Sequence, residues 1–195
     1  MTDETQNQEG QTFTKIDYTD QALTNEAYYD CAFVGCDFSN SDLMGSIFED
    51  CRFENCNFSM TKIQGVSFKD AQFKACKIIG LDFSECNKYM FSFSFTQCHI
   101  DYCTFFDTRL QQTKFDQCSL RETDFSQANL TSSVFLECDL TGTIFMHSVL
   151  NKVDFRTAKN FAIDPEHNTL KKAKFTAFNL EGLLYKHHLD IEYLT

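Results

Sequence analysis

The sequence predicts an all-β solenoid in which a short extended segment is followed by a corner every five residues. Fifteen consecutive apolar residues recur at five-residue spacing from Phe13 to Phe83, and twelve more recur from Ile100 to Phe155. The residue two positions before each of these centres is small in most units. A five-residue period fits neither a helix, with about 3.6 residues per turn, nor a long strand, so a corner must end each unit.

The first ten residues are expected to form a flexible polar tail. Residues 1–10 show no basic start and no apolar stretch typical of a signal peptide, and no segment of the chain reaches the roughly 20 apolar residues that cross a bilayer. A cytoplasmic protein is therefore expected. The net charge of −11 argues against direct binding to nucleic acid or an anionic membrane, and it leaves open a partner protein with a basic groove. The alternative is that this charge only keeps the protein soluble.

Residues 11–180 are expected to form the solenoid. Residues two apart in an extended segment face the same way, so each unit would point one small and one large side chain inward. All seven glycines stand where a corner is expected, and a tight corner favours a residue without Cβ. The chain has 22 Phe and no Trp, which fits one inward position filled repeatedly by the same residue.

The repeat changes register within residues 84–98. Lys88 would occupy a centre if the first register continued, but the pattern resumes two residues late. Phe91, Phe93 and Phe95 all compete for the inward positions, and the sequence does not decide between them. We expect a two-residue bulge here, which is either only structural or a kink that binds a partner.

These features resemble the pentapeptide-repeat family, whose consensus is Ala, Asp or Asn, Leu, and two variable residues. Matching units include CDFSN, SDLMG, TDFSQ and ANLTS, and the resemblance spans about residues 11–180. It implies a right-handed quadrilateral β-helix, in which four units form one coil of about 20 residues and coils stack about 4.8 Å apart. Such a solenoid needs a cap at both ends.

All ten cysteines would occupy the small inward position. They are Cys31, Cys36, Cys51, Cys56, Cys76, Cys86, Cys98, Cys103, Cys118 and Cys138. Stacked cysteines would have Cα atoms about 4.8 Å apart, but their parallel Cβ atoms would lie too far apart for a disulfide. The chain has no CxxC pair and no set of neighbouring histidines, so the cysteines do not indicate a zinc site. We therefore expect free buried thiols, with no metal, no cofactor and no catalytic residue.

Five aspartates are the candidate partner-binding residues, because packing uses the inward positions. Stacking of coils would place Asp30, Asp50 and Asp70 on one ridge and Asp17 beside Asp37 on another. A column of like charges is unfavourable unless salt or a basic partner compensates. The alternative is that these aspartates only accept hydrogen bonds at the corners.

The C-terminal part departs from the repeat. Residues 158–169 are irregular, and the register then returns at Leu170, Phe175 and Leu180. Residues 181–195 are expected to form a cap of a short helix and a short strand, which also makes a symmetric dimer. The predicted dimerisation residues are Leu183, Leu184, Tyr185, Leu189, Ile191 and Tyr193. The alternative is a cap on a monomer.

The C-terminal sequence IDPEHNTLKKAKF, followed by GLL and a short alternating segment, is similar to the Qnr and MfpA group of this family. That resemblance implies a tail-to-tail dimer that protects DNA gyrase and topoisomerase IV from fluoroquinolones. In this group an acidic rod resembles duplex DNA and binds the enzyme where DNA would. The chain has no insertion long enough to match the projecting loops of many Qnr members. A scaffold for an unrelated protein is the alternative function.

Overall fold

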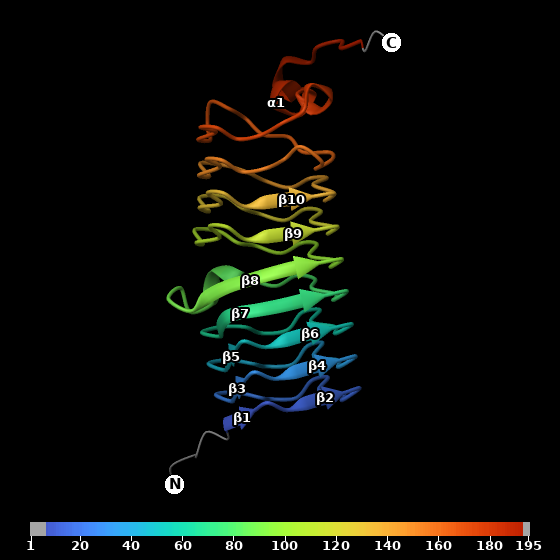
Figure 1. The fold of residues 1–195 in the computed structure, drawn as a ribbon, viewed down its shortest axis with the longest axis vertical. Coiled ribbons are helices and arrows are strands. Elements are labelled where there is room, and N and C mark those ends of the chain that lie inside the picture. Colours follow the sequence, from blue (N-terminus) through green and yellow to red (C-terminus); the bar gives the residue numbers. More distant parts are fainter. Residues whose placement is uncertain (1–6, 193–195) are drawn as a thin grey trace.

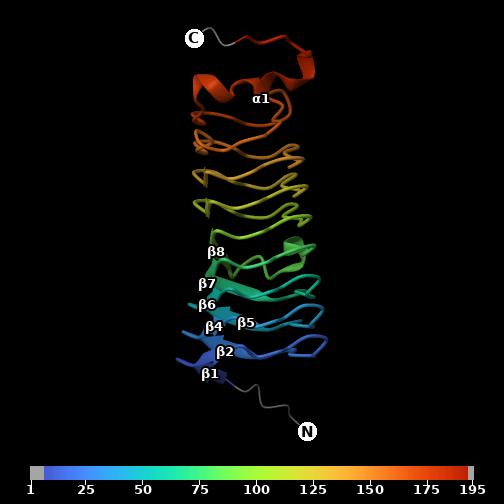
Figure 2. The same cartoon turned by 90° about the vertical axis from the view of Figure 1, so that its right-hand side faces the viewer.

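The computed structural model describes residues 7–192, which form a four-sided β-helix with short helices at its C-terminal end (Figure 1). The chain crosses the front of the rod from left to right as it rises from the N-terminal end, so the helix is right-handed (Figure 1). Figure 2 shows the same stack of coils after a quarter turn. The ten strands belong to one sheet, and every pair of neighbouring strands is parallel.

The strands are short because a corner follows most units. They are β1 (Asn7–Glu9), β2 (Thr12–Thr14), β3 (Ala27–Tyr29), β4 (Ala32–Val34), β5 (Ile47–Glu49), β6 (Arg52–Glu54), β7 (Ser67–Lys74), β8 (Phe91–Thr96), β9 (Lys114–Asp116) and β10 (Val134–Leu136). The short helices are η1 (Phe83–Glu85), η2 (Ala177–Asn179), α1 (Glu181–Leu184) and η3 (Tyr185–His187). The other two sides of the rod are joined by isolated parallel bridges, for example between Asp17 and Asp37.

The solenoid begins within the stretch 1–10 for which the sequence predicts a flexible tail. Strand β1 pairs with β3 in the same twenty-residue register as later coils, with Gln8 opposite Tyr28. The polar residues of β1 can form this strand because the edge of β3 offers unpaired backbone groups. The tail boundary predicted at residue 10 is therefore wrong, and residues 1–6 lie outside the described part of the chain.

Each side of the rod is named here after its first centre: the Phe13 face, the Tyr18 face, the Leu23 face and the Tyr28 face. The corner residue between two faces has a left-handed backbone, as in Asp30 (φ 50°) and Gly45 (φ 72°). Six of the seven glycines have a positive φ, which agrees with their predicted place at corners. The exception is Gly182, which lies in α1 and not at a corner.

Stacked aromatic rings form much of the core. On the Phe13 face the ring centroids of successive coils are 4.8 to 5.4 Å apart. This ladder consists of Phe13, Phe33, Phe53, Phe73, Phe95, Phe115, Phe135, Phe155 and Phe175. Offset-stacked rings add roughly 0.5–1.5 kcal/mol per pair to the effect of burial, so the repeated Phe joins each coil to the next.

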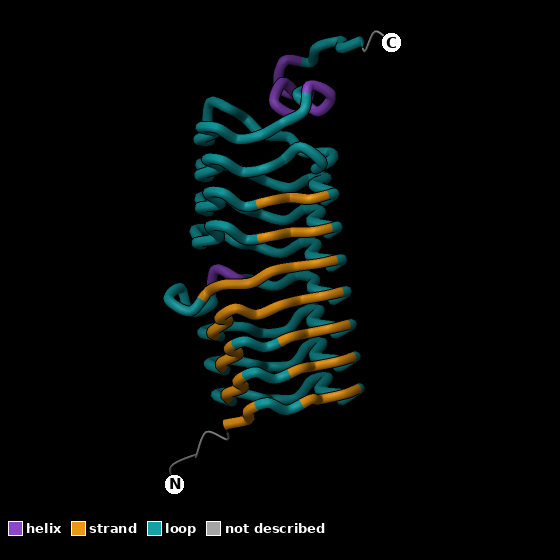
Figure 3. The backbone as a smooth tube through the Cα atoms, viewed as in Figure 1, coloured by secondary structure: helices purple, strands orange, loops and turns teal. Residues whose placement is uncertain are grey.

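The register change is a short loop that projects from the side of the rod between η1 and β8 (Figure 3). Phe93 and Phe95 turn inward and are 7% and 0% exposed, whereas Phe91 is only half-buried. The register between β7 and β8 shifts between the Phe68/Phe91 and Ala71/Phe93 pairs. The coils on either side stay in contact because the loop takes up the two additional residues.

Candidate functional site

Asp30, Asp50 and Asp70 stack on the corner between the Tyr28 face and the Phe13 face, as the sequence predicts. All three have left-handed backbones, with φ between 50° and 54°. Asp70 Oδ1 accepts a hydrogen bond from Ser92 Oγ at 3.1 Å. The side chains of Asp30 and Asp50 have neither a hydrogen bond nor an ion pair within residues 7–192. Their charges are therefore available to a partner.

The same corner reverses its charge toward the C-terminal end. It continues through Gln112 and Ser132 to Lys152 and Lys172, all with positive φ. The backbone N–H of Lys152 donates to the Lys171 carbonyl at 2.9 Å, which brings a further lysine beside this corner. The acidic ridge is thus confined to the N-terminal part of the rod. The twenty-residue spacing of Lys152 and Lys172 is visible in the sequence. The two-residue shift at the bulge, however, takes these lysines out of the twenty-residue series of Asp30, Asp50 and Asp70.

Asp17 and Asp37 form a different kind of pair on the Tyr18 face. The Thr19 N–H donates to Asp17 at 2.9 Å, and the Ser39 N–H donates to Asp37 at 2.9 Å. Asn57 also donates to Asp37 at 3.1 Å. Burial raises the pKa of Asp37, but the hydrogen bonds from Ser39 and Asn57 outweigh burial and lower it. These two aspartates are acceptors at corners, which is the alternative that the sequence left open.

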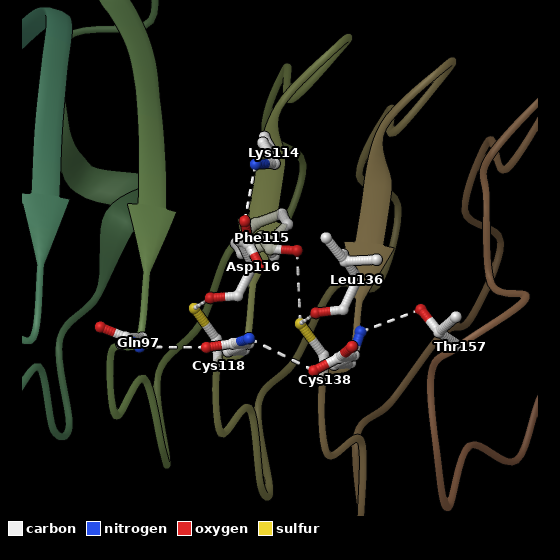
Figure 4. Close-up of polar contacts among 10 residues, drawn as sticks. Gln97, Lys114, Phe115, Asp116, Cys118, Leu136, Cys138 and Thr157 are labelled. Carbon is white, nitrogen blue, oxygen red and sulfur yellow. Dashed lines mark hydrogen bonds and ion pairs between the residues drawn. The ribbon is translucent and has the colours of Figure 1, made fainter.

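The ten cysteines are free and buried, as predicted. Their thiols donate to backbone carbonyls, as in Cys118 to Asp116 at 3.4 Å and Cys138 to Phe115 at 3.4 Å (Figure 4). Burial raises the pKa of the Cys51 thiol to about 12. Within residues 7–192 no group of His, Cys, Asp and Glu is arranged to hold a metal ion. The ten thiols therefore lack the exposure that a nucleophile needs.

A polar groove on the Tyr18 face is closed by its own hydrogen bonds. An amide ladder runs along its edge, with Gln97 donating to Gln117 at 3.0 Å and Gln117 donating to Glu137 at 3.3 Å (Figure 4). Inside the groove Arg121 donates to Asp139 at 2.7 Å. In the described part of the chain, no buried side-chain nitrogen or oxygen lacks a partner. The hydrogen bonds between its own side chains therefore fix the shape of the groove.

Apolar side chains gather on the outer side of the C-terminal cap. Leu184, Tyr185, Leu189 and Ile191 line one hollow and are 38% to 56% exposed. Leu183, which is also among the predicted dimerisation residues, is half-buried and packs against the solenoid core. Tyr193 lies outside the described residues.

The strand predicted near the C-terminus is absent from the described residues 188–192. His188 has a left-handed backbone (φ 49°), and residues 189–192 run away from the last coil (Figure 1). Alternating apolar residues form a strand only where a neighbouring strand supplies hydrogen bonds, and this segment has no such neighbour within residues 7–192. The described part of the chain has no helix long and apolar enough to cross a membrane.

The cap is fixed to the solenoid by a buried carboxylate and a close backbone contact, which the sequence did not reveal. Asp164 is buried and contacts both His167 and Lys186, and these two contacts lower the pKa of its carboxyl group. The N–H of Ile163 donates to the Gly182 carbonyl at 2.9 Å. The short helices α1 and η3 of the cap are therefore held in a defined position over the last coil.

Comparison with known proteins agrees with this architecture. The model of the pentapeptide repeat region matches residues 66–145 and 109–185, and the model of pentapeptide repeats in eight copies matches residues 30–59. A search of curated proteins found no match.

Two solved structures show the same fold at low sequence identity. A trypsin-treated variant of QnrB1, a plasmid-mediated fluoroquinolone resistance protein, aligns with a TM-score of 0.73 and 15% identity over 96% of this chain and 92% of its own. HetL from the cyanobacterium Nostoc, a pentapeptide repeat protein involved in the regulation of heterocyst differentiation, aligns with a TM-score of 0.57 and 14% identity. That alignment covers 86% of this chain and 84% of HetL.

Proposed function

Because the chain belongs to the pentapeptide-repeat family, we propose that it is a non-enzymatic binding protein whose partner is a type II topoisomerase, DNA gyrase or topoisomerase IV. The observation that carries this proposal is the ridge of Asp30, Asp50 and Asp70, in which the carboxylates of Asp30 and Asp50 have neither a hydrogen bond nor an ion pair within residues 7–192. Lys69, which pairs with Glu49, is the cation beside Asp50 and Asp70. Like charges stacked at about 4.8 Å favour a basic surface that would compensate them. The C-terminal resemblance to the Qnr and MfpA group supports the same partner.

The acidic half of the rod is the part that would occupy the position of DNA. Residues 1–98 contain 15 acidic and 7 basic residues, a net charge of −8, whereas residues 99–195 contain 13 and 10, a net charge of −3. Duplex DNA of about 40 Å carries roughly 24 phosphate charges. The whole chain carries −11, less than half of that number. DNA mimicry by this chain would therefore be confined to its N-terminal half.

We further propose that the protein acts as a homodimer joined through the outer side of its cap. Leu184, Tyr185, Leu189 and Ile191 expose apolar surface that residues 7–192 leave uncovered. Residues 189–192 have no strand neighbour in that described part of the chain, and the same segment of a second copy would supply one. The dimer would place the two acidic halves at opposite ends of a longer rod.

A supercoiling assay with purified gyrase, with and without ciprofloxacin, tests the partner. We expect the wild-type protein to inhibit supercoiling or to protect it from the drug. A variant with Asp30, Asp50 and Asp70 replaced by Asn should lose most of this effect, because the ridge loses its charge. The absence of any effect by micromolar wild-type protein would overturn the proposal.

The matched control removes the same number of charges from other corners and faces. It combines Asp20→Asn, Glu26→Gln and Glu137→Gln, which changes the net charge equally but leaves the ridge intact. If this control loses as much activity as the ridge variant, then overall charge and not the ridge determines binding.

A protein scaffold with an unrelated partner is the second candidate function. It is favoured by exposed apolar side chains on the body of the rod, including Tyr89 at 96% and Tyr102 at 66% exposed. A mimic of DNA has no use for such side chains, whereas protein interfaces are enriched in Tyr, Phe and Met. Under this function, replacement of the ridge aspartates by Asn would leave partner binding unchanged.

A further inference from the structure

The exposed large apolar side chains of the rod are concentrated on one of its four sides. Between residues 20 and 160, every exposed side chain of this kind lies on the Leu23 face, at one of its two corners or in the loop beside it. These residues are Met44, Met60, Tyr89, Tyr102, Phe106, Ile144 and Met146, and they are 41% to 96% exposed. The other three faces are packed to the same depth without such residues, so the stability of the core does not require this distribution.

The Leu23 face carries two outward columns that differ in chemistry. The centres point inward, so the residues immediately before and after each centre point outward. The column after the centres contains Met44, Phe106 and Met146, separated by small or polar residues. The column before the centres contains Asp42, Asp82 and Asp124, together with Lys62, Thr104 and Ile144. Three acids and one base give this column a net charge of −2. A column with three large apolar side chains thus runs beside a column with a net negative charge along the axis of the rod.

The three aspartates are half-buried on this face and bonded locally. Each accepts a backbone N–H at one oxygen: Asp42 from Met44 at 3.0 Å, Asp82 from Ser84 at 2.9 Å and Asp124 from Ser126 at 2.7 Å. None of the three forms an ion pair within residues 7–192.

The loop at the register change lies at the edge of the same face. Lys88 Nζ is 2.7 Å from Oδ2 of Asp107, the residue that follows Phe106. Tyr89 next to Lys88 is almost fully exposed, at 96%. The loop therefore adds an aromatic side chain beside the apolar column.

Charge decides which occupant fits this face. A second copy of the chain, placed face to face, would bring acidic columns close to each other, and like charges across an interface oppose binding. A partner with basic residues beside apolar ones would match both columns. The apolar column from Met44 to Met146 spans five coils, about 24 Å, which corresponds to about 16 residues of α-helix.

We propose that the Leu23 face binds a basic amphipathic α-helix of the partner protein. The apolar stripe of the helix packs on Met44, Phe106 and Met146, and its basic residues face Asp42, Asp82 and Asp124. The inference rests on the proposed function only in that the partner is a protein with a basic surface. It assigns binding to a face that does not include the ridge of Asp30, Asp50 and Asp70.

Methionine methyl NMR tests the proposal directly, because Met44, Met60 and Met146 all lie on or beside the Leu23 face. The full chain, labelled with ¹³C at the methionine methyl groups, is titrated with a synthetic Leu/Lys amphipathic helix of about 18 residues. We expect the signals of these three methionines to shift in a saturable manner. Binding that leaves them unchanged, or no binding at all, overturns the proposal.

The matched variants carry equal added charge on opposite faces. Phe106→Asp with Met146→Asp should weaken peptide binding by about tenfold or more, since it removes two of the three large apolar contacts of the column. Thr12→Asp with Gln72→Asp adds two negative charges on the Phe13 face and should leave binding unchanged. Equal thermal unfolding of both variants shows that each is folded. Equal loss of binding in both variants contradicts the assignment of the face.

Titration with gyrase separates this inference from the proposed function. If gyrase binds and the three methionine signals do not shift, the Leu23 face is not its docking surface and this inference is overturned, while the proposed function stands. If the peptide shifts the signals but gyrase does not bind, the face is confirmed and the topoisomerase is the wrong partner.

Discussion

Replacement of Phe115 by Ala removes an interior ring of the aromatic ladder on the Phe13 face. Phe115 is fully buried and stacks on Phe95 at 5.3 Å and on Phe135 at 4.9 Å. It also meets Phe125 edge to face at 5.9 Å. Loss of a buried Phe side chain lowers the free energy of unfolding by about 3–5 kcal/mol. We expect the upper part of this range, because the ring contributes to two junctions between coils.

Denaturant unfolding followed by circular dichroism measures this change. Each coil of a solenoid contacts only its neighbours, so weakening both junctions at Phe115 should also separate unfolding into two transitions. Phe13→Ala is the matched control, because Phe13 is half-buried and stacks on one ring only, Phe33 at 4.8 Å. Its effect should be less than half as large. An equal effect at both positions, or less than about 1.5 kcal/mol at Phe115, would refute the nearest-neighbour reasoning.

Three further predictions concern the cap and the thiols. A Cβ on Gly182 would lie 2.4 Å from the Phe161 carbonyl oxygen, so Gly182→Ala should displace the cap and speed amide exchange in η2 and α1, and unchanged exchange would contradict this packing. The replacements Leu184→Asp and Ile191→Asp together should produce a monomer in sedimentation velocity, and a persistent dimer would place the interface elsewhere. Burial raises the pKa of Cys51 and of Cys103 to about 12, whereas an unfolded thiol ionises near about pH 8.5. The unfolded state therefore loses its protons first as pH rises, and the contribution of these two thiols to the free energy of unfolding should be constant below about pH 8 and fall above it. Stability that does not change up to about pH 10 would show that the thiols are not buried in this way.

The five-residue period alone predicts which side chains point into the core. Phe33, Phe53 and Cys56 occupy the positions predicted for them because a side chain at each centre has no other place than the core. The period could not decide between Phe91 and Phe93, since both are apolar and both are two residues from a neighbouring Phe. That choice depends on the closure of one coil around the loop, which involves residues far apart in the chain.

Which outward side chains come together on one face depends on the side of the rod that each unit occupies. Met44, Phe106 and Met146 each follow a centre of the Leu23 face, but a count in steps of twenty connects only Phe106 with Met146. The two-residue shift at the bulge moves Met44 out of that series. The contacts of Asp164 with His167 and Lys186 had no sequence signal of this kind, because the irregular segment and the cap do not follow the repeat.

The ridge that supports the proposed function also limits the way in which a dimer could use it. Asp30 and Asp50 lie near the N-terminal end of the rod, whereas Lys152 and Lys172 lie near the cap on the same corner. A dimer joined at the caps would therefore carry acidic ridges at its two ends and basic ridges around its centre. A uniform duplex of DNA has no such reversal, so a basic groove could accept one acidic end but would repel the centre. A full-length mimic would bind along the whole dimer, whereas this distribution predicts that each acidic half engages a partner separately. Replacing Lys152 and Lys172 by Glu should then extend the acidic surface and strengthen binding to gyrase, and weaker binding would show that the lysines contact the partner.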